Sequence, residues 1–149
     1  MRLSVGYGMV RQQMQNTKLC KEPKEQFVGR HLLVEGRAPR QLLSNKHLLK
    51  LVFDLLVDTL DMQYLQEPIF YEVPLDEGKL NTEEFQDEGG VTGFAVITTS
   101  HLSIHSWPLR GFFSMDIYSC RDFSPREAVD VLEAYGFTDL KVTNISRVF

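Results

Sequence analysis

The chain has 149 residues, of which 43% are hydrophobic and 24% are charged, and this composition suits a single domain with a substantial apolar core. Its formal net charge of −4 argues against a nucleic-acid partner, because no basic stripe is present to neutralise phosphates. The sequence shows no long apolar run and no signal peptide, and its two cysteines fit neither a disulfide framework nor a metal site, so we expect a reduced cytoplasmic protein without a membrane span.

The first predicted elements are an arm, a strand and a helix. Residues 1–28 carry mixed charge and are predicted to form an N-terminal arm or an extra strand, ahead of a domain over residues 29–149. Residues 29–36 are an apolar run bounded by glycines, which predicts a strand. A helix capped by Ser44 or Asn45 follows, because apolar residues recur there at spacings of three and four. Its predicted buried face consists of Leu48, Leu49, Val52, Phe53, Leu56 and Leu60.

The middle of the chain is predicted to form strands interrupted by a solvated acidic loop over residues 76–88. The predicted strands cover residues 69–74, 94–97, 102–107 and 112–120. In the last of these, apolar and polar side chains alternate, so Phe113, Met115 and Ile117 should face a helix-covered core. The opposite set should form a polar or active-site face and consists of Ser114, Asp116, Tyr118 and Cys120.

A second helix has an explicit start, because Ser124 and Glu127 have the spacing of a capping box around Pro125 at the first helical position. Gly136 should end this helix, and residues 140–143 should form a final strand. Its buried face is predicted to consist of Ala128, Val131, Leu132 and Tyr135. The fold class expected is α+β: a two-layer sandwich in which two helices cover one face of an antiparallel sheet.

Three side chains with complementary chemistry lie within 21 residues, namely Ser100, His105 and Cys120. A serine hydroxyl is a nucleophile, and an imidazole, with an ordinary pKa near 6.5, can shuttle protons at neutral pH. A thiol, with an ordinary pKa near 8.5, is mostly protonated and can donate a proton. Between the serine and the cysteine, the sequence Ile-His-Ser-Trp-Pro completes a long ordered motif.

This segment, residues 89–120, resembles the catalytic segment of the S-adenosylmethionine decarboxylases, in particular their small prokaryotic, pyruvoyl-dependent form. A weaker resemblance extends over residues 29–36 and the second helix. The resemblance implies that the chain cleaves its own backbone between Thr99 and Ser100. The Ser100 hydroxyl would attack the Thr99 carbonyl carbon to give an ester, and elimination and hydrolysis would then turn Ser100 into a pyruvoyl group.

The resemblance also implies roles for the neighbouring side chains. His105 would assist processing, Thr92 would help to hold the oxyanion, and Cys120 would donate the proton that replaces carbon dioxide. The pyruvoyl ketone would form a Schiff base with the substrate amine, and no metal would be needed. Substrate contacts are expected from Phe94, Trp107 and Leu109. A homodimer with sites near or across its interface and a role in polyamine (spermidine) biosynthesis are further implications.

Two departures from the family pattern keep other functions open. Thr99 and Leu109 both stand where the family has glutamate, and a leucine cannot accept hydrogen bonds from ribose hydroxyls. One alternative is therefore the same chemistry on another amino acid, such as ornithine or arginine. The other is an unprocessed, inactive homologue that acts as a binding or regulatory subunit.

The spacing of Ser100 and His105 raises a geometric problem. Their separation is odd, so a regular strand would place them on opposite faces of the sheet. A bulge or a strand break is expected between them, and His101 is the rival imidazole if the strand is regular.

Overall fold

The structure is a computed structural model that describes residues 28–81 and 87–148. Apart from Val28, the predicted arm over residues 1–28 lies outside the described residues. The described elements, in chain order, are β1 (Val28–Arg37), α1 (Arg40–Leu43), α2 (Lys46–Thr59), β2 (Ile69–Val73), the 3₁₀ helix η1 (Glu77–Asn81), β3 (Gly90–Ile97), β4 (Ser100–Trp107), β5 (Phe112–Ser119), α3 (Pro125–Ala134) and β6 (Thr138–Val148).

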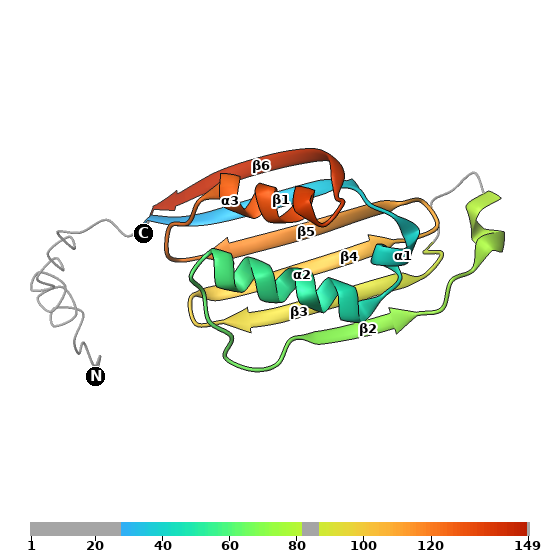
Figure 1. The fold of residues 1–149 in the computed structure, drawn as a ribbon, viewed down its shortest axis with the longest axis horizontal. Helices are drawn as coiled ribbons and strands as arrows, with labels where there is room; N and C mark the ends of the chain where they lie inside the picture. The colour runs from blue at the N-terminus through green and yellow to red at the C-terminus, as the bar shows by residue number, and fades with distance from the viewer. Residues whose placement is uncertain (1–27, 82–86, 149) are drawn as a thin grey trace, which may run out of the picture.

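The strands form one six-stranded antiparallel sheet in the order β2-β3-β4-β5-β1-β6. Helices α2 and α3 lie on the same face of this sheet, as Figure 1 shows. The predicted α+β, two-layer architecture is therefore confirmed. No described helix has the length and apolar character needed to cross a membrane.

Several local expectations differ from the structure, among them the start of β3, which begins at Gly90 and not at the predicted residue 94. The first residues of the predicted acidic loop form η1 (Glu77–Asn81), and α1 adds a short helical turn before α2. The final strand is longer than the predicted residues 140–143, because β6 pairs with β1 from Arg37↔Thr138 to Val28↔Val148. This pairing joins residues more than a hundred positions apart, so local sequence patterns carry little information about its length.

The first turns of α2 and α3 are each fixed by a side-chain N-cap. The Asn45 side chain caps α2 by accepting the backbone N–H groups of His47 at 2.9 Å and Leu48 at 3.2 Å. Ser124 caps α3 by accepting the N–H of Glu127 at 3.3 Å, with Pro125 in the first turn. Both sequence-based N-caps are confirmed.

The predicted helical faces are largely, though not completely, buried. All of the predicted α2 face is buried except Leu48, which is half-buried against the core. In α3, Ala128 and Leu132 are buried and Val131 is half-buried, but Tyr135 is 37% exposed. Tyr135 was expected in the buried face and instead becomes the C-cap residue at the rim of the helix layer, just before Gly136 with its φ of 92°.

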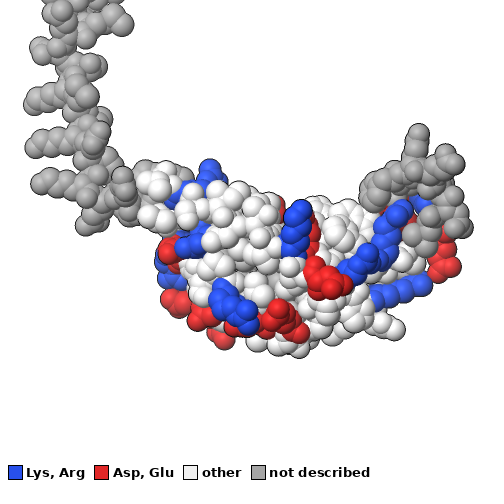
Figure 2. Space-filling view, turned by 90° about the horizontal axis from the view of Figure 1, so that it is seen from above, with Lys and Arg blue, Asp and Glu red and all other residues white. Residues whose placement is uncertain are grey.

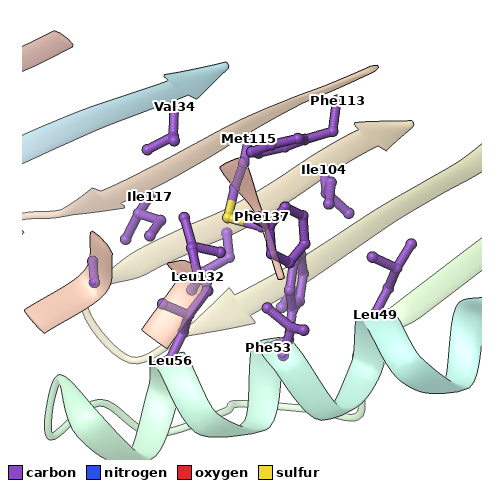
Figure 3. Close-up of a cluster of buried hydrophobic side chains, with 14 of the residues drawn as sticks. Val34, Leu49, Phe53, Leu56, Ile104, Phe113, Met115, Ile117, Leu132 and Phe137 are labelled. Atoms are coloured by element: carbon purple, nitrogen blue, oxygen red, sulfur yellow. The ribbon is translucent and has the colours of Figure 1, made fainter. Parts of the chain in front are cut away.

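The core fills the space between the sheet and its two helices (Figure 3). Phe53 and Leu56 of α2 and Leu132 of α3 point toward the sheet, which contributes the predicted β5 set. Phe113 meets Phe137 edge to face, with ring centroids 4.6 Å apart. The β5 alternation is thereby confirmed: Phe113, Met115 and Ile117 are buried, whereas Ser114, Asp116 and Tyr118 are only half-buried on the opposite side.

We call the sheet surface turned away from the helices the open face, and none of the described elements covers it. Large apolar side chains are exposed on it, including Phe94 at 42% and Tyr71 at 67%. Figure 2 views the domain from the edge of the sheet and not onto the open face, and along this edge acidic and basic side chains are interspersed with uncharged stretches. The open-face residues used below are His31, Thr92, Phe94, His101, Ser103, His105, Trp107, Ser114, Asp116 and Tyr118.

Ser106 is a buried serine whose hydroxyl links β4 to β3 and to the last residue of α1. Its hydroxyl accepts the N–H of Val91 at 2.9 Å and lies 2.8 Å from the carbonyl oxygen of Leu43, to which it donates. We expect Ser106→Ala to lower the free energy of unfolding by about 1–3 kcal/mol, because the Val91 N–H loses its partner in a buried place. Urea denaturation would measure this loss, with the half-exposed Ser103→Ala as the matched control. An equal effect of the two substitutions would contradict the expectation.

Candidate active site

Ser100 begins β4 directly after the turn at Thr98 and Thr99 that connects it to β3. The strand register pairs Ser100 with Ile97 on one side and with Ser119 on the other. The backbone φ of Ser100 is 155°, a conformation that L-residues rarely adopt and that costs on the order of 1–3 kcal/mol. The peptide bond predicted to be cleaved therefore adjoins a strained residue.

The carbonyl group of Thr99 is held by the end of β5. Its oxygen accepts the backbone N–H of Cys120 at 2.9 Å. A fixed N–H donor of this kind stabilises the negative charge that develops on a carbonyl oxygen under nucleophilic attack. The structure thus brings Thr99, Ser100 and Cys120 together, and it leaves the Cys120 side chain exposed.

His105 and Thr92 form a second group, on the open face. Thr92 Oγ1 and His105 Nδ1 are 3.1 Å apart, and the direction of this hydrogen bond depends on the imidazole tautomer. Trp107 extends the group, because its ring centroid lies 6.4 Å from that of His105 and 5.5 Å from that of Phe112. These residues offer a proton-transfer pair beside an aromatic surface.

The two groups do not meet within one chain. Every residue of β4 from Ser100 to Trp107 pairs in unbroken register with β5, so the bulge or break expected between Ser100 and His105 is wrong for this strand. The register places Ser100 on the same face as the buried Leu102, whereas His105 lies on the open face. Five residues of extended strand also separate the two by about 17 Å. His101, the rival imidazole, shares the open face with His105.

His101 lies among aromatic rings at the centre of the open face. Its ring stacks on Phe94 with centroids 5.7 Å apart and contacts Tyr118 at 5.5 Å. Burial lowers the pKa of His101 below its ordinary value and the nearby His31 lowers it further, although Asp116 acts in the opposite direction. The His101 side chain is therefore biased toward its neutral form.

This lowered pKa predicts a pH dependence of stability. As the pH falls through about 6.5, the unfolded chain takes up a proton at His101 that the folded chain resists, so the free energy of unfolding should decrease. We expect His101→Phe, which keeps an aromatic ring, to lose less stability between about pH 7 and pH 5 than the parent. Urea denaturation at several pH values would measure the difference. Equal losses in both proteins would contradict this expectation.

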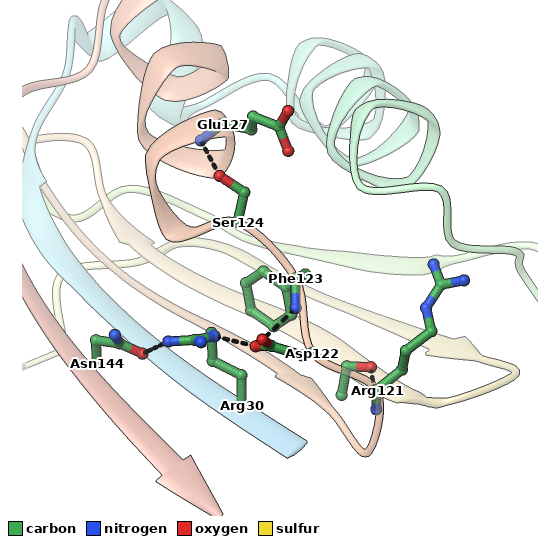
Figure 4. Close-up of polar contacts among 8 residues, drawn as sticks. Arg30, Arg121, Asp122, Phe123, Ser124, Glu127 and Asn144 are labelled. Atoms are coloured by element: carbon green, nitrogen blue, oxygen red, sulfur yellow. Dashed lines mark hydrogen bonds and ion pairs between the residues drawn. The ribbon is translucent and has the colours of Figure 1, made fainter. Parts of the chain in front are cut away.

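The loop between β5 and α3 is anchored beside the Thr98–Thr99 turn. Arg121 donates to the carbonyl oxygens of Leu60 and Asp61 and to the Asp61 carboxylate, joining this loop to the end of α2. Arg30 of β1 donates to the Asp122 carboxylate at 2.6 Å, as Figure 4 shows, and this hydrogen bond lowers the pKa of Asp122. A polar cavity of about 410 Å³ opens beside the Arg121 anchor, lined by Asp61, Met62, Gln63, Thr98, Thr99 and Arg121.

The remaining predicted site residues lie in different places. Phe94 is on the open face against His101, and Leu109 is half-buried in the turn after β4, at the opposite end of the strand from Ser100. Ser119 was missed by the sequence analysis, although the alternation of β5 places it on the apolar face, where a serine is unusual. Within residues 28–81 and 87–148, no three His, Cys, Asp or Glu side chains are grouped as metal ligands.

Comparisons with known proteins place the whole described domain in one family. The family model described as S-adenosylmethionine decarboxylase matches residues 30–148. An S-adenosylmethionine decarboxylase proenzyme of Syntrophomonas wolfei is 28% identical over 124 residues, which is 82% of this chain and 88% of that protein. The corresponding proenzyme of Pyrobaculum neutrophilum is 44% identical over 71 residues, or 47% of this chain and 54% of that protein. The chain therefore spans about half the length of this second relative.

A solved structure agrees at the level of the fold. The adenosylmethionine decarboxylase of Aquifex aeolicus superposes with a TM-score of 0.60 at 20% identity, covering 80% of this chain and 89% of that one. Identity this low shows a shared fold alone. The family model, by contrast, matches most of the chain, from β1 to the end of β6. The chain belongs to the S-adenosylmethionine decarboxylase family.

Proposed function

We propose that this protein is a self-processing decarboxylase that acts on S-adenosylmethionine and serves polyamine (spermidine) biosynthesis in the cytoplasm. The observation that carries the proposal is the Thr99 carbonyl, which accepts the Cys120 N–H next to the strained Ser100. Membership of the family supports the substrate, and the names of the related proenzymes support self-processing.

Self-cleavage uses groups of the chain itself. Ser100 Oγ attacks the carbonyl carbon of Thr99, and the hydrogen bond from the Cys120 N–H stabilises the negative charge that develops on the carbonyl oxygen. The C–N bond between Thr99 and Ser100 then breaks and leaves an ester. Removal of the Ser100 α-proton then releases the Thr99 carboxylate. Hydrolysis of the resulting dehydroalanine gives ammonia and a pyruvoyl group at position 100. Backbone strain at Ser100 favours the attack on Thr99, because breaking the peptide bond between Thr99 and Ser100 relieves this strain.

His105 and Thr92 enter the reaction from a second copy of the chain. Within one chain His105 faces away from Ser100, so the histidine that assists cleavage would come from a partner subunit and reach Ser100 where it is half-buried at the end of β4. The open face carries the Thr92–His105 pair and exposed apolar side chains, which is the composition of a surface that is buried on association. A two-fold homodimer would therefore complete two equivalent sites.

The pyruvoyl group, when present, supplies an electron sink for the departing carbon dioxide. Cys120 provides the proton that replaces carbon dioxide, since its thiol is exposed and its own backbone N–H bonds the carbonyl oxygen of Thr99, next to Ser100. Phe94 and Trp107 offer aromatic surface to an adenine on the open face. Leu109, at the opposite end of β4, would reach a substrate only in the site of the partner subunit.

Intact-mass measurement of the full chain under denaturing conditions tests processing first. We expect two fragments, residues 1–99 and a pyruvoyl-headed fragment 100–149. Release of labelled carbon dioxide from S-adenosylmethionine, with ornithine and arginine assayed in parallel, then tests the substrate. A full-length mass that stays unchanged on long incubation would overturn the proposal, and release from ornithine or arginine alone would overturn the substrate.

A further inference from the structure

Thr99 is held at its carbonyl oxygen and at its hydroxyl by two consecutive residues, the last residue of β5 and the one that follows it. Its carbonyl oxygen accepts the Cys120 N–H at 2.9 Å, and its Oγ1 accepts the hydroxyl of Ser119 at 3.0 Å. Ser119 Oγ in turn accepts the backbone N–H of Arg121 at 3.0 Å, and a dashed line in Figure 4 marks this bond at Arg121. The hydroxyl therefore uses one acceptor position for the Arg121 N–H and its single proton for Thr99.

Ser119 is a rigid anchor. Its exposed fraction is 0%, so water cannot take the place of its hydrogen bonds. Its backbone lies in the interior of the sheet, where β5 is flanked by both β4 and β1, and it pairs with Ser100 and Arg30. A group attached to Ser119 is therefore held in place by three strands.

Thr99, by contrast, needs such an anchor. It lies in a two-residue turn next to Ser100, whose φ of 155° persists only where the surroundings impose it. Threonine is branched at Cβ and has few χ1 rotamers, so a hydrogen bond that fixes Oγ1 also fixes the position of the Thr99 backbone. Ser119 and the Cys120 N–H together hold the side chain and the carbonyl of the same residue.

We propose that Ser119 is a positioning residue for self-cleavage: through Thr99 Oγ1 it keeps the Thr99 carbonyl in line with Ser100 Oγ and the Cys120 N–H. This role rests on the proposed self-cleavage between Thr99 and Ser100. The Ser119 hydroxyl bonds Thr99 Oγ1 and the Arg121 N–H, so we place its effect on cleavage in the position of Thr99. A displacement of about 1 Å at a reacting centre slows a reaction by about 100-fold, which sets the upper end of the expected effect.

The test is the first-order rate constant of cleavage of the full chain, followed by intact mass from a freshly synthesised precursor. We expect Ser119→Ala to cleave about 10- to 100-fold more slowly than the parent. Ser119→Thr, which keeps the hydroxyl, should recover most of the rate. The matched control is Ser106→Ala, which also removes a buried, hydrogen-bonded serine but lies at the other end of β4 and should leave the rate unchanged at a temperature where both variants stay folded.

A double-mutant cycle with Thr99→Val separates positioning from general damage, and the Thr99→Val variant alone serves as the test if Ser119→Ala does not fold. Valine keeps the branched shape of threonine and removes Oγ1, so Thr99→Val alone should slow cleavage to a similar degree. In that background the further substitution Ser119→Ala should have little additional effect. The pH profile of cleavage should keep its shape, because Ser119 does not titrate.

The outcomes separate this inference from the proposed function. If the parent chain cleaves and either Ser119→Ala or Thr99→Val cleaves equally fast, the role of Ser119 is overturned and the proposed function is not. Additive effects in the cycle, or a rate loss in Ser106→Ala as large as in Ser119→Ala, overturn it as well. A parent chain that never cleaves overturns the proposed function, and the role of Ser119 with it.

Discussion

Two variants that are each unable to cleave should restore cleavage in each other when they are assembled together. Ser100→Ala lacks the nucleophile and His105→Ala lacks the imidazole, so each homodimer should stay full-length. A mixed dimer, however, combines the Ser100 of one subunit with the His105 of the other. We expect about half of the His105→Ala chains to be cleaved after random assembly of equal amounts, because half of them then lie in mixed dimers, where their Ser100 meets the intact His105 of the partner.

The experiment requires co-expression of the two chains with different tags, followed by intact-mass measurement of each. The physical basis is the unbroken β4 register, which places Ser100 and His105 on opposite faces of the sheet. Co-expression of Ser100→Ala with Thr92→Ala is a parallel case, because Thr92 bonds His105 on the same face. Absence of cleavage in the mixture, together with a confirmed mixed dimer, would show that the histidine does not act across the interface.

Cys120→Ala should separate processing from turnover. The substitution keeps the backbone N–H that Thr99 accepts at 2.9 Å, so we expect the chain to cleave at close to the parental rate. Turnover of S-adenosylmethionine should fall by about 10²- to 10⁴-fold, because the carbon that has lost carbon dioxide then has no positioned proton donor. Intact mass and labelled carbon dioxide release, measured on the same preparation, would test both parts.

Cys120→Ser is the informative companion variant. A hydroxyl keeps the shape of the thiol but donates a proton less readily, so its turnover should lie between those of the parent and Cys120→Ala. Cleaved Cys120→Ala protein with full turnover would contradict the role of the thiol. Loss of cleavage in Cys120→Ala would instead show that the side chain, and not only the N–H group, takes part in processing.

The sequence alone was sufficient for elements encoded over a few neighbouring residues. The three- and four-residue spacing of α2, the caps at Asn45 and Ser124 and the alternation of β5 all depend on local periodicity, and all are seen in the structure. The motif around Ser100 and His105 was enough for the family, because its residues are consecutive or nearly so. The catalytic roles of these residues stay predictions.

The tertiary structure decided what depends on residues far apart in the chain. The length of β6 follows from its pairing with β1, and the burial of Ser119 against Thr99 requires β4 and β5 to be in one register. The odd spacing of Ser100 and His105 indicated that a regular strand would place them on opposite faces of the sheet. Only the unbroken register excluded a bulge that would have put both side chains on the same face. Strand pairing is set by packing over the whole sheet, and a local pattern does not encode it.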